Sequence, residues 1–300
     1  MKKALFNPLD LKKWFVVGFT AFLSGLTDCG GGSGSGGKRS SNVDWEDVLY
    51  FPEKASEWLA DNPVWAMVIA FAAVLVVVLI VLIAWWSSRG KFMFLDNVVH
   101  DRAQVLAPWN EYKREGNSLF LWMLLFGAIL ITVVVAYLVQ CFTDLRTLYE
   151  LGGDERELIM PAILMGLGLI AIFLVNGFID LLLYDFVVPI MYKRRITTLR
   201  AVRIFFPLFL SKFLYFLGFA LFSFFIFVVA LICILLVGLV TCCVGFLFLA
   251  IPYINSVVLL PILYTMRAFS VEFLEQFGGE YHVFPRGESA PTATEPVTGS

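Results

Sequence analysis

Residues 63–86 form an apolar run without a single ionisable side chain, and no other feature constrains the fold as strongly. A helix needs about 20 such residues to cross the hydrocarbon core of a bilayer. Trp85 and Trp86 close the run just before Arg89 and Lys91, an order typical of a span that reaches the lipid–water boundary. The run therefore predicts a transmembrane helix.

Further apolar runs predict further crossings. Residues 119–142 and 158–183 each suit one helix, and residues 204–266 are long enough for two, with a turn near residues 238–245. Residues 14–26 are shorter than a usual span, so they predict either one more crossing or a helix lying in the interface. The expected fold class is all-α: a polytopic transmembrane bundle of about six spans, or of five spans plus an interfacial N-terminal helix.

The composition argues against several classes of function. Hydrophobic residues make up 60% of the chain and charged residues 15%, whereas about a quarter of a soluble domain is charged. A net charge of -2 provides no basic field for nucleic acid. The five cysteines and two histidines lack metal-ligand spacing, and no nucleophile–base arrangement accompanies His100. We therefore expect no metal, no cofactor and no enzymatic activity.

The chain divides by composition into four parts. Residues 1–29 predict an amphipathic or short membrane helix, and residues 30–62 a glycine- and serine-rich linker followed by an acidic, aromatic exterior segment. Residues 63–283 predict the helical membrane domain, and residues 284–300 a disordered tail. The sequence LTDC before the linker imitates a lipoprotein signal, but its acidic residue argues against that alternative.

Residues 89–117 are the longest polar segment between two predicted spans. Apolar residues recur there at helical spacing, and polar residues fill the other side. The pattern predicts an amphipathic elbow helix on the cytoplasmic membrane surface, bent at Pro108. Its two predicted faces are a lipid- or helix-facing side with Leu95, Val99, Leu106 and Trp109 and a water-facing side with Asp96, Arg102 and Lys113.

Basic residues are distributed unevenly between the loops. With six crossings that start inside, seventeen Lys and Arg fall on one side and five on the other. The positive-inside rule then predicts a multi-pass protein of a bacterial inner membrane with a cytoplasmic C-terminus. A candidate basic patch for anionic headgroups lies on the same side and consists of Lys193, Arg194, Arg195, Arg200 and Arg203.

Three polar residues within apolar runs form a candidate intramembrane site. Asn176 and Asp180 are four residues apart and so share a helix face. Asn255 lies between Pro252 and Pro261, which predict a broken or kinked helix. An intramembrane carboxylate indicates a proton or ion pathway, and pairing at the interface is the alternative.

Four segments carry a resemblance to a known family: KWFVVGFTAFLSGL, RGKFMFLDNVVHDRAQVLAPWNEYKREGNSLFLW, YDFVVPIMYKRR and MRAFSVEFLEQFGGEYHVFP. Together they resemble a family of uncharacterised bacterial polytopic membrane proteins. That family looks distantly similar to the membrane domain of some glycerophosphoryl diester phosphodiesterases. The resemblance implies a helical membrane domain and no established activity, because this chain has no room for a phosphodiesterase barrel of about 250 residues.

These observations favour a non-enzymatic scaffold, or a module that interacts with lipid or protein. The expected partners are membrane lipids and a protein at the cytoplasmic face, with no nucleic acid. A small transporter or channel that uses Asn176, Asp180 and the Pro252–Pro261 break is the alternative, and an enzyme that acts on lipids is a third.

Overall fold

A computed structural model describes residues 11–26, 49–152, 155–240 and 252–284. Within these ranges the chain is helical and has no strand. Four of the described helices are long and apolar enough to span a membrane. The predicted all-α class is therefore confirmed. The predicted 30–42 linker and most of the predicted tail lie outside the described ranges, as do Cys29, Cys242 and Cys243.

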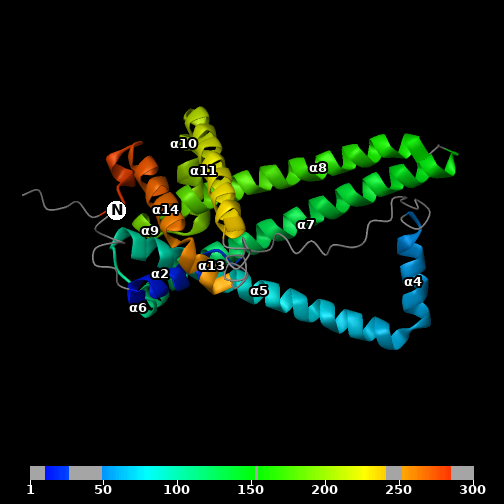
Figure 1. The fold of residues 1–300 in the computed structure, drawn as a ribbon, viewed down its shortest axis with the longest axis horizontal. Coiled ribbons are helices and arrows are strands. Elements are labelled where there is room, and N and C mark those ends of the chain that lie inside the picture. Colours follow the sequence, from blue (N-terminus) through cyan, green and yellow to red (C-terminus); the bar gives the residue numbers. More distant parts are fainter. Residues whose placement is uncertain (1–10, 27–48, 153–154, 241–251, 285–300) are drawn as a thin grey trace, which may run out of the picture.

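Three long helices form an extended stem, which we define as residues 63–86 of α5, residues 120–150 of α7 and all of α8. These helices are α5 (Pro63–Val99), α7 (Lys113–Glu150) and α8 (Glu155–Leu182). They run from one end of the molecule to the other, and α7 and α8 form a hairpin (Figure 1). No side chain of residues 63–82 is buried, as expected for helices that present apolar side chains to lipid.

A short helix closes the far end of the stem. Helix α4 (Phe51–Asp61) leads into the start of α5 and bridges the space between that end of α5 and the hairpin (Figure 1). The residue just before it, Leu49, is buried against Leu145 and Leu158. Arg146 pairs with Glu53 at 2.6 Å, so α4 and the hairpin tip are joined by apolar and ionic contacts.

The other end of the stem is a compact helical domain, which we call the head. Residues 87–99 of α5 and the first residues of α7 enter it and pack with several shorter helices. These are α2 (Leu11–Ser24), α6 (Leu106–Glu111), the π-helix η2 (Leu183–Val187), α9 (Val188–Arg194), α10 (Thr198–Ser211), α14 (Leu260–Glu275) and the 3-10 helix η3 (Gly279–Tyr281).

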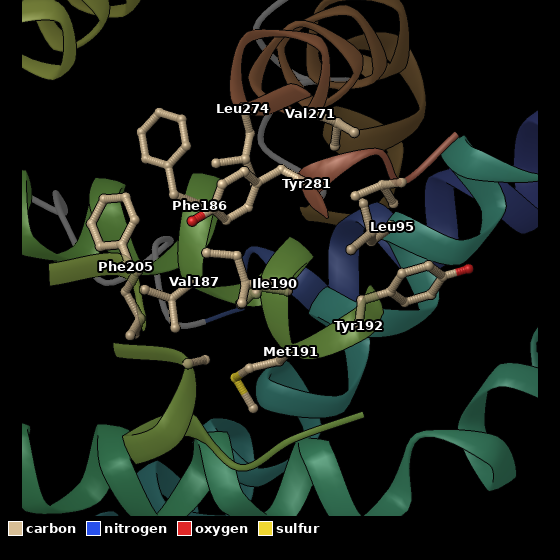
Figure 2. Close-up of a cluster of buried hydrophobic side chains, with 14 of the residues drawn as sticks. Leu95, Phe186, Val187, Ile190, Met191, Tyr192, Phe205, Val271, Leu274 and Tyr281 are labelled. Carbon is tan, nitrogen blue, oxygen red and sulfur yellow. The ribbon is translucent and has the colours of Figure 1, made fainter. Parts of the chain in front are cut away.

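The head has a dense apolar core. Figure 2 shows members of this core from three helices: Leu95 of α5, Ile190 of α9, and Val271 and Leu274 of α14. The Phe186 ring lies among the rings of Phe205, Phe216, Phe219 and Phe273, with centroids 4.9–5.8 Å apart. Each fully buried side chain of this size contributes about 1.5–3 kcal/mol, so this core is the main source of stability among the head contacts.

The predicted run 204–266 is divided differently from expectation. A break at Lys212 separates α10 from α11 (Phe213–Val240), so the long apolar helix begins nine residues later than predicted. The reason is that α10 buries Ala201 and Phe205 in the head and does not continue the span. After residues 241–251, α13 (Pro252–Val258) and α14 are separated at Leu259, which confirms the predicted interruption before Pro261.

Helix α2 packs along the head portion of α5. Ser87 donates to the Ser24 carbonyl at 2.9 Å, and Lys13 pairs with Asp101 at 2.8 Å, so the two helices run in opposite directions. The preceding stretch, 63–86, is about 36 Å long and already covers a hydrocarbon core of about 30 Å. Helix α2 thus lies beyond that stretch, and at 14 residues it is shorter than the four candidate spans.

The elbow prediction is wrong for its first half. Residues 87–99 continue α5 without a break, and every one of them is buried. Asp96, which we predicted to face water, is 0% exposed because α2 and α9 cover the sides of α5 that a surface helix would leave open. Only α6 and the residues around it lie at the surface, where Leu106 is 76% exposed.

Candidate functional site

Asp96 lies at the centre of a buried polar network in the head. Its carboxylate accepts three hydrogen bonds from Arg102 at 2.7–3.0 Å and one from the Tyr192 hydroxyl at 2.9 Å. His100 Nδ1 lies 3.2 Å from the same carboxylate. The hydrogen bond with Asp96 raises the pKa of Arg102 above its ordinary value. With its lone pairs occupied, this carboxylate holds helix ends together and is not an open catalytic base.

An aromatic stack continues from this network. The Tyr112 ring is stacked between the rings of Phe92 and Tyr192, with centroid distances of 6.0 and 4.8 Å. The Arg195 guanidinium lies 3.9 Å from the Tyr112 ring centroid. Burial raises the pKa of Tyr112 to about 12, so its hydroxyl is neutral at physiological pH.

Arg267 is a second buried charge in the head, at 1% exposure. Its Nη1 donates to the Tyr184 carbonyl at 2.6 Å, and its guanidinium lies 4.2 Å from the Tyr184 ring centroid. The π-helix explains this contact: Val188 donates to the carbonyl five residues back, and Pro189 has no N–H for the next one. Arg267 therefore satisfies a carbonyl that Pro189 leaves without a helical donor. Asp185 lies 3.6 Å away and balances part of the charge.

The predicted basic patch separates into two groups. Lys193 donates to the His282 carbonyl, Arg194 pairs with Glu280 at 2.6 Å, and Arg195 pairs with Glu111. These three side chains therefore join α9 to the C-terminal segment and to α6. Their contribution to binding a headgroup is reduced by these internal partners.

Arg200 and Arg203 form the other group, on α10. Both are exposed, and neither takes part in an ion pair among the described residues. Leu199, Phe206 and Leu210 on the same helix are 66%, 55% and 61% exposed. We call these five residues the α10 surface. It combines positive charge with bare apolar side chains, which is the chemistry of a lipid headgroup boundary.

The three candidate intramembrane residues do not form one hydrogen-bonded group in the described structure. Asn176 Nδ2 donates to Asp180 at 2.9 Å, and both residues lie on α8. Asn176 also lines an apolar groove of about 370 Å³ between α7 and α8. Asn255 lies on α13, which packs against α2. Within the described ranges, no cluster of three or more metal-ligating side chains occurs.

Sequence reasoning missed the buried charges Asp96 and Arg267. Asp96 occupies the polar side of an amphipathic pattern, and such a pattern cannot reveal a second layer of helices above it. Gly90 was an available signal, because glycine costs a helix about 1 kcal/mol and needs a packing reason. Here a Cβ on Gly90 would lie 2.6 Å from the Leu23 backbone.

Together, the apolar stem and the packed head define the class: a multi-pass α-helical membrane protein. A family model described as "Family of unknown function (DUF7544)" matches residues 1–278, and the chain belongs to that family. No curated protein and no solved structure matches the chain.

Proposed function

We propose that this protein is a non-enzymatic membrane module whose head binds the adjacent leaflet, or a protein on it, through the α10 surface. The main supporting observation is that Arg200 and Arg203 are exposed on the same helix as the exposed side chains of Leu199, Phe206 and Leu210. Each basic side chain near an anionic leaflet contributes about 1 kcal/mol, and the apolar side chains add burial. A scaffold role is supported by the uninterrupted passage of α5 and α7 from the stem into the head.

The proposed location is a bacterial inner membrane with the head and the C-terminus on the cytoplasmic side. The support is the distribution of charge, since the described far end of the stem has only Lys54, Arg146 and Arg156 as basic residues. The described basic residues of the head are Lys12, Lys13, Arg89, Lys91, Arg102, Lys113, Arg114, Lys193, Arg194, Arg195, Arg200, Arg203, Lys212 and Arg267. This asymmetry follows the positive-inside rule.

The test uses spin labels at positions 199 and 206, in a full-length variant that lacks the five native cysteines. In vesicles with phosphatidylglycerol, we expect both labels to be more accessible to oxygen than to a water-soluble nickel reagent. The double substitution R200Q/R203Q should shift both labels toward water, because it removes the headgroup attraction. K113Q/R114Q is the matched control, since it removes two exposed charges from α7. Labels that are fully water-accessible in these vesicles would overturn the proposal.

A small transporter or channel is the second candidate, supported by the Asn176–Asp180 pair. Asn176 Oδ1 is buried without a hydrogen-bond partner on a helix of the stem. An amide and a carboxylate at this depth suit the relay of a proton. The test is proton flux into liposomes that contain the protein and a trapped pH-sensitive dye. Flux that Asp180→Asn abolishes would favour transport, and equal leakage with and without the protein would exclude proton conduction.

A further inference from the structure

Arg89 is a buried cation for which the described residues provide no acid. It is 9% exposed, and its guanidinium lies 4.4 Å from the ring centroid of Trp85 and 4.9 Å from that of Trp109. Its Nη2 donates to Asn117 at 3.0 Å, and its Nε is buried with no partner. By contrast, Arg102, Arg146, Arg194, Arg195 and Arg267 each face a carboxylate.

This lack of a counter-ion is unusual for a buried charge. Burying an ionised side chain is costly, and such groups are normally paired. Cation–π contacts contribute about 0.5–2 kcal/mol each and leave the net charge unchanged. An anion beside Arg89 would therefore be favourable.

An apolar groove is lined by Trp109, whose ring also contacts this arginine, although Arg89 itself is not a lining residue. The groove encloses about 440 Å³ between α2, α5 and α6, which is within the usual range for small-ligand sites. Its lining residues are Phe19, Phe22, Leu23, Leu26, Ile83, Trp86, Met93, Val105, Leu106 and Trp109. Trp109 belongs to both features, because the same indole lines the groove and contacts the Arg89 guanidinium. Ile83 belongs to the apolar stem, so one end of the groove reaches the predicted lipid-facing part of α5.

We infer that Arg89 and this groove form a binding site for one amphiphile with an anionic headgroup and a single apolar chain in the groove. A phosphate or carboxylate oxygen accepts hydrogen bonds from the guanidinium, and the chain lies along Leu23, Ile83 and Leu106. The site is separate from the α10 surface: α2 and α6 lie on the other side of α9 and α14 from α10 (Figure 1). The two proposals are therefore independent, and disproving one does not disprove the other.

The experiment measures ligand retention by the full-length protein in detergent, using native mass spectrometry. Three probes are added separately: dioleoyl phosphatidylglycerol, oleate and the zwitterionic dioleoyl phosphatidylcholine. We expect one molecule of an anionic probe per chain and at least tenfold weaker retention of phosphatidylcholine. The phosphatidylglycerol and oleate arms distinguish a membrane phospholipid from a free fatty acid as the source of the headgroup.

Two variants test the two halves of the site. Arg89→Gln should weaken retention of the anionic probe about tenfold or more, because it removes the charge and the hydrogen-bonding plane. Leu106→Trp should weaken it as well by filling the groove, and Leu106 is exposed enough that the fold is unaffected. Arg114→Gln removes one exposed charge from α7 and is the matched control, with unchanged retention.

Equal retention of phosphatidylcholine and the anionic probes would overturn the inference. So would unchanged retention in a folded Arg89→Gln protein. If Arg89→Gln fails to fold, as judged by helical content and elution volume, Leu106→Trp decides: unchanged retention in that variant overturns the site.

Discussion

The head and the stem place helices of the same chain in opposite environments. In the head, residues 87–99 of α5 are buried on all sides, and charged groups such as Asp96 and Arg267 find specific partners. In the stem, the same helix has no buried side chain between residues 63 and 82. The identity of each residue therefore matters in the head, whereas apolarity is the main requirement in the stem.

The segments that carry the family resemblance follow this division. The segments 13–26, 89–122, 184–195 and 266–284 all contribute to the head, and their side chains meet in its core and polar networks. The long apolar runs of the stem lie mostly outside them. The segments of the resemblance therefore lie mainly in the head, whereas the family model covers residues 1–278 and includes the stem.

The largest expected effect is the loss of the Asp96 carboxylate. Asp96→Ala leaves Arg102 and Tyr192 without their acceptor, and breaking a buried pair costs about 3 kcal/mol or more. The detergent-solubilised variant should melt at a clearly lower temperature or fail to fold. Asp144→Ala removes an exposed carboxylate near the hairpin tip and should change the melting temperature little. Equal melting of the two variants would contradict the contrast between head and stem.

Truncating one isoleucine in each region should give the next largest difference in stability. Ile190 is 2% exposed in the head core, and Ile190→Ala should cost about 2–4 kcal/mol by leaving a cavity. Ile80 is 59% exposed on the stem, and Ile80→Ala leaves no cavity there. The stability difference between the two variants should appear as a shift in melting temperature for Ile190→Ala alone. A comparable shift for Ile80→Ala would indicate that the stem packs against protein and not only lipid.

The helices of the stem could be predicted from the sequence, but the packing of the head could not. Residues 63–86, 119–142 and 158–183 were predicted to be helical spans because length and apolarity alone decide that class. The burial of Asp96 depends on helices contributed by distant segments, and a local period cannot report them.

Two further details of the candidate regions escaped prediction for local reasons. The break at Lys212 lies within a continuous apolar run, where the single charge was compatible with one helix. The π-helix precedes Pro189, whose missing N–H leaves the Tyr184 carbonyl free to accept from Arg267. By contrast, Arg200 and Arg203 are exposed on α10, and their binding of lipid headgroups stays a prediction.

One added methyl group should destabilise the head but not the stem, and its effect should be smaller than those of the substitutions above. A Cβ on Gly90 would lie 2.6 Å from the Leu23 backbone and 2.7 Å from the Ser24 nitrogen, so Gly90→Ala must displace α2. We expect a loss of about 1–3 kcal/mol from this overpacking. Gly127→Ala on α7 meets no atom within 4 Å and should not destabilise. The check is the melting temperature, with faster proteolysis near residue 26 as a second readout for Gly90→Ala only.

The smallest effect concerns the C-terminal edge of the head and depends on pH. Burial would raise the pKa of Glu275, but hydrogen bonds from the backbone of Phe284 and Val283 and from His282 outweigh burial and hold it below its ordinary value. A carboxyl group with a lowered pKa stabilises the fold at neutral pH, and this contribution disappears as the pH falls through the lowered pKa. Glu275→Gln should therefore melt slightly below the wild type at pH 7, by the equivalent of about 1 kcal/mol or less, and the difference should vanish in acid. Glu272→Gln, at an exposed position one turn away, is the control. A difference between wild type and Glu275→Gln that stays constant from neutral to acid pH would mean that the carboxylate charge does not hold residues 282–284 against the head.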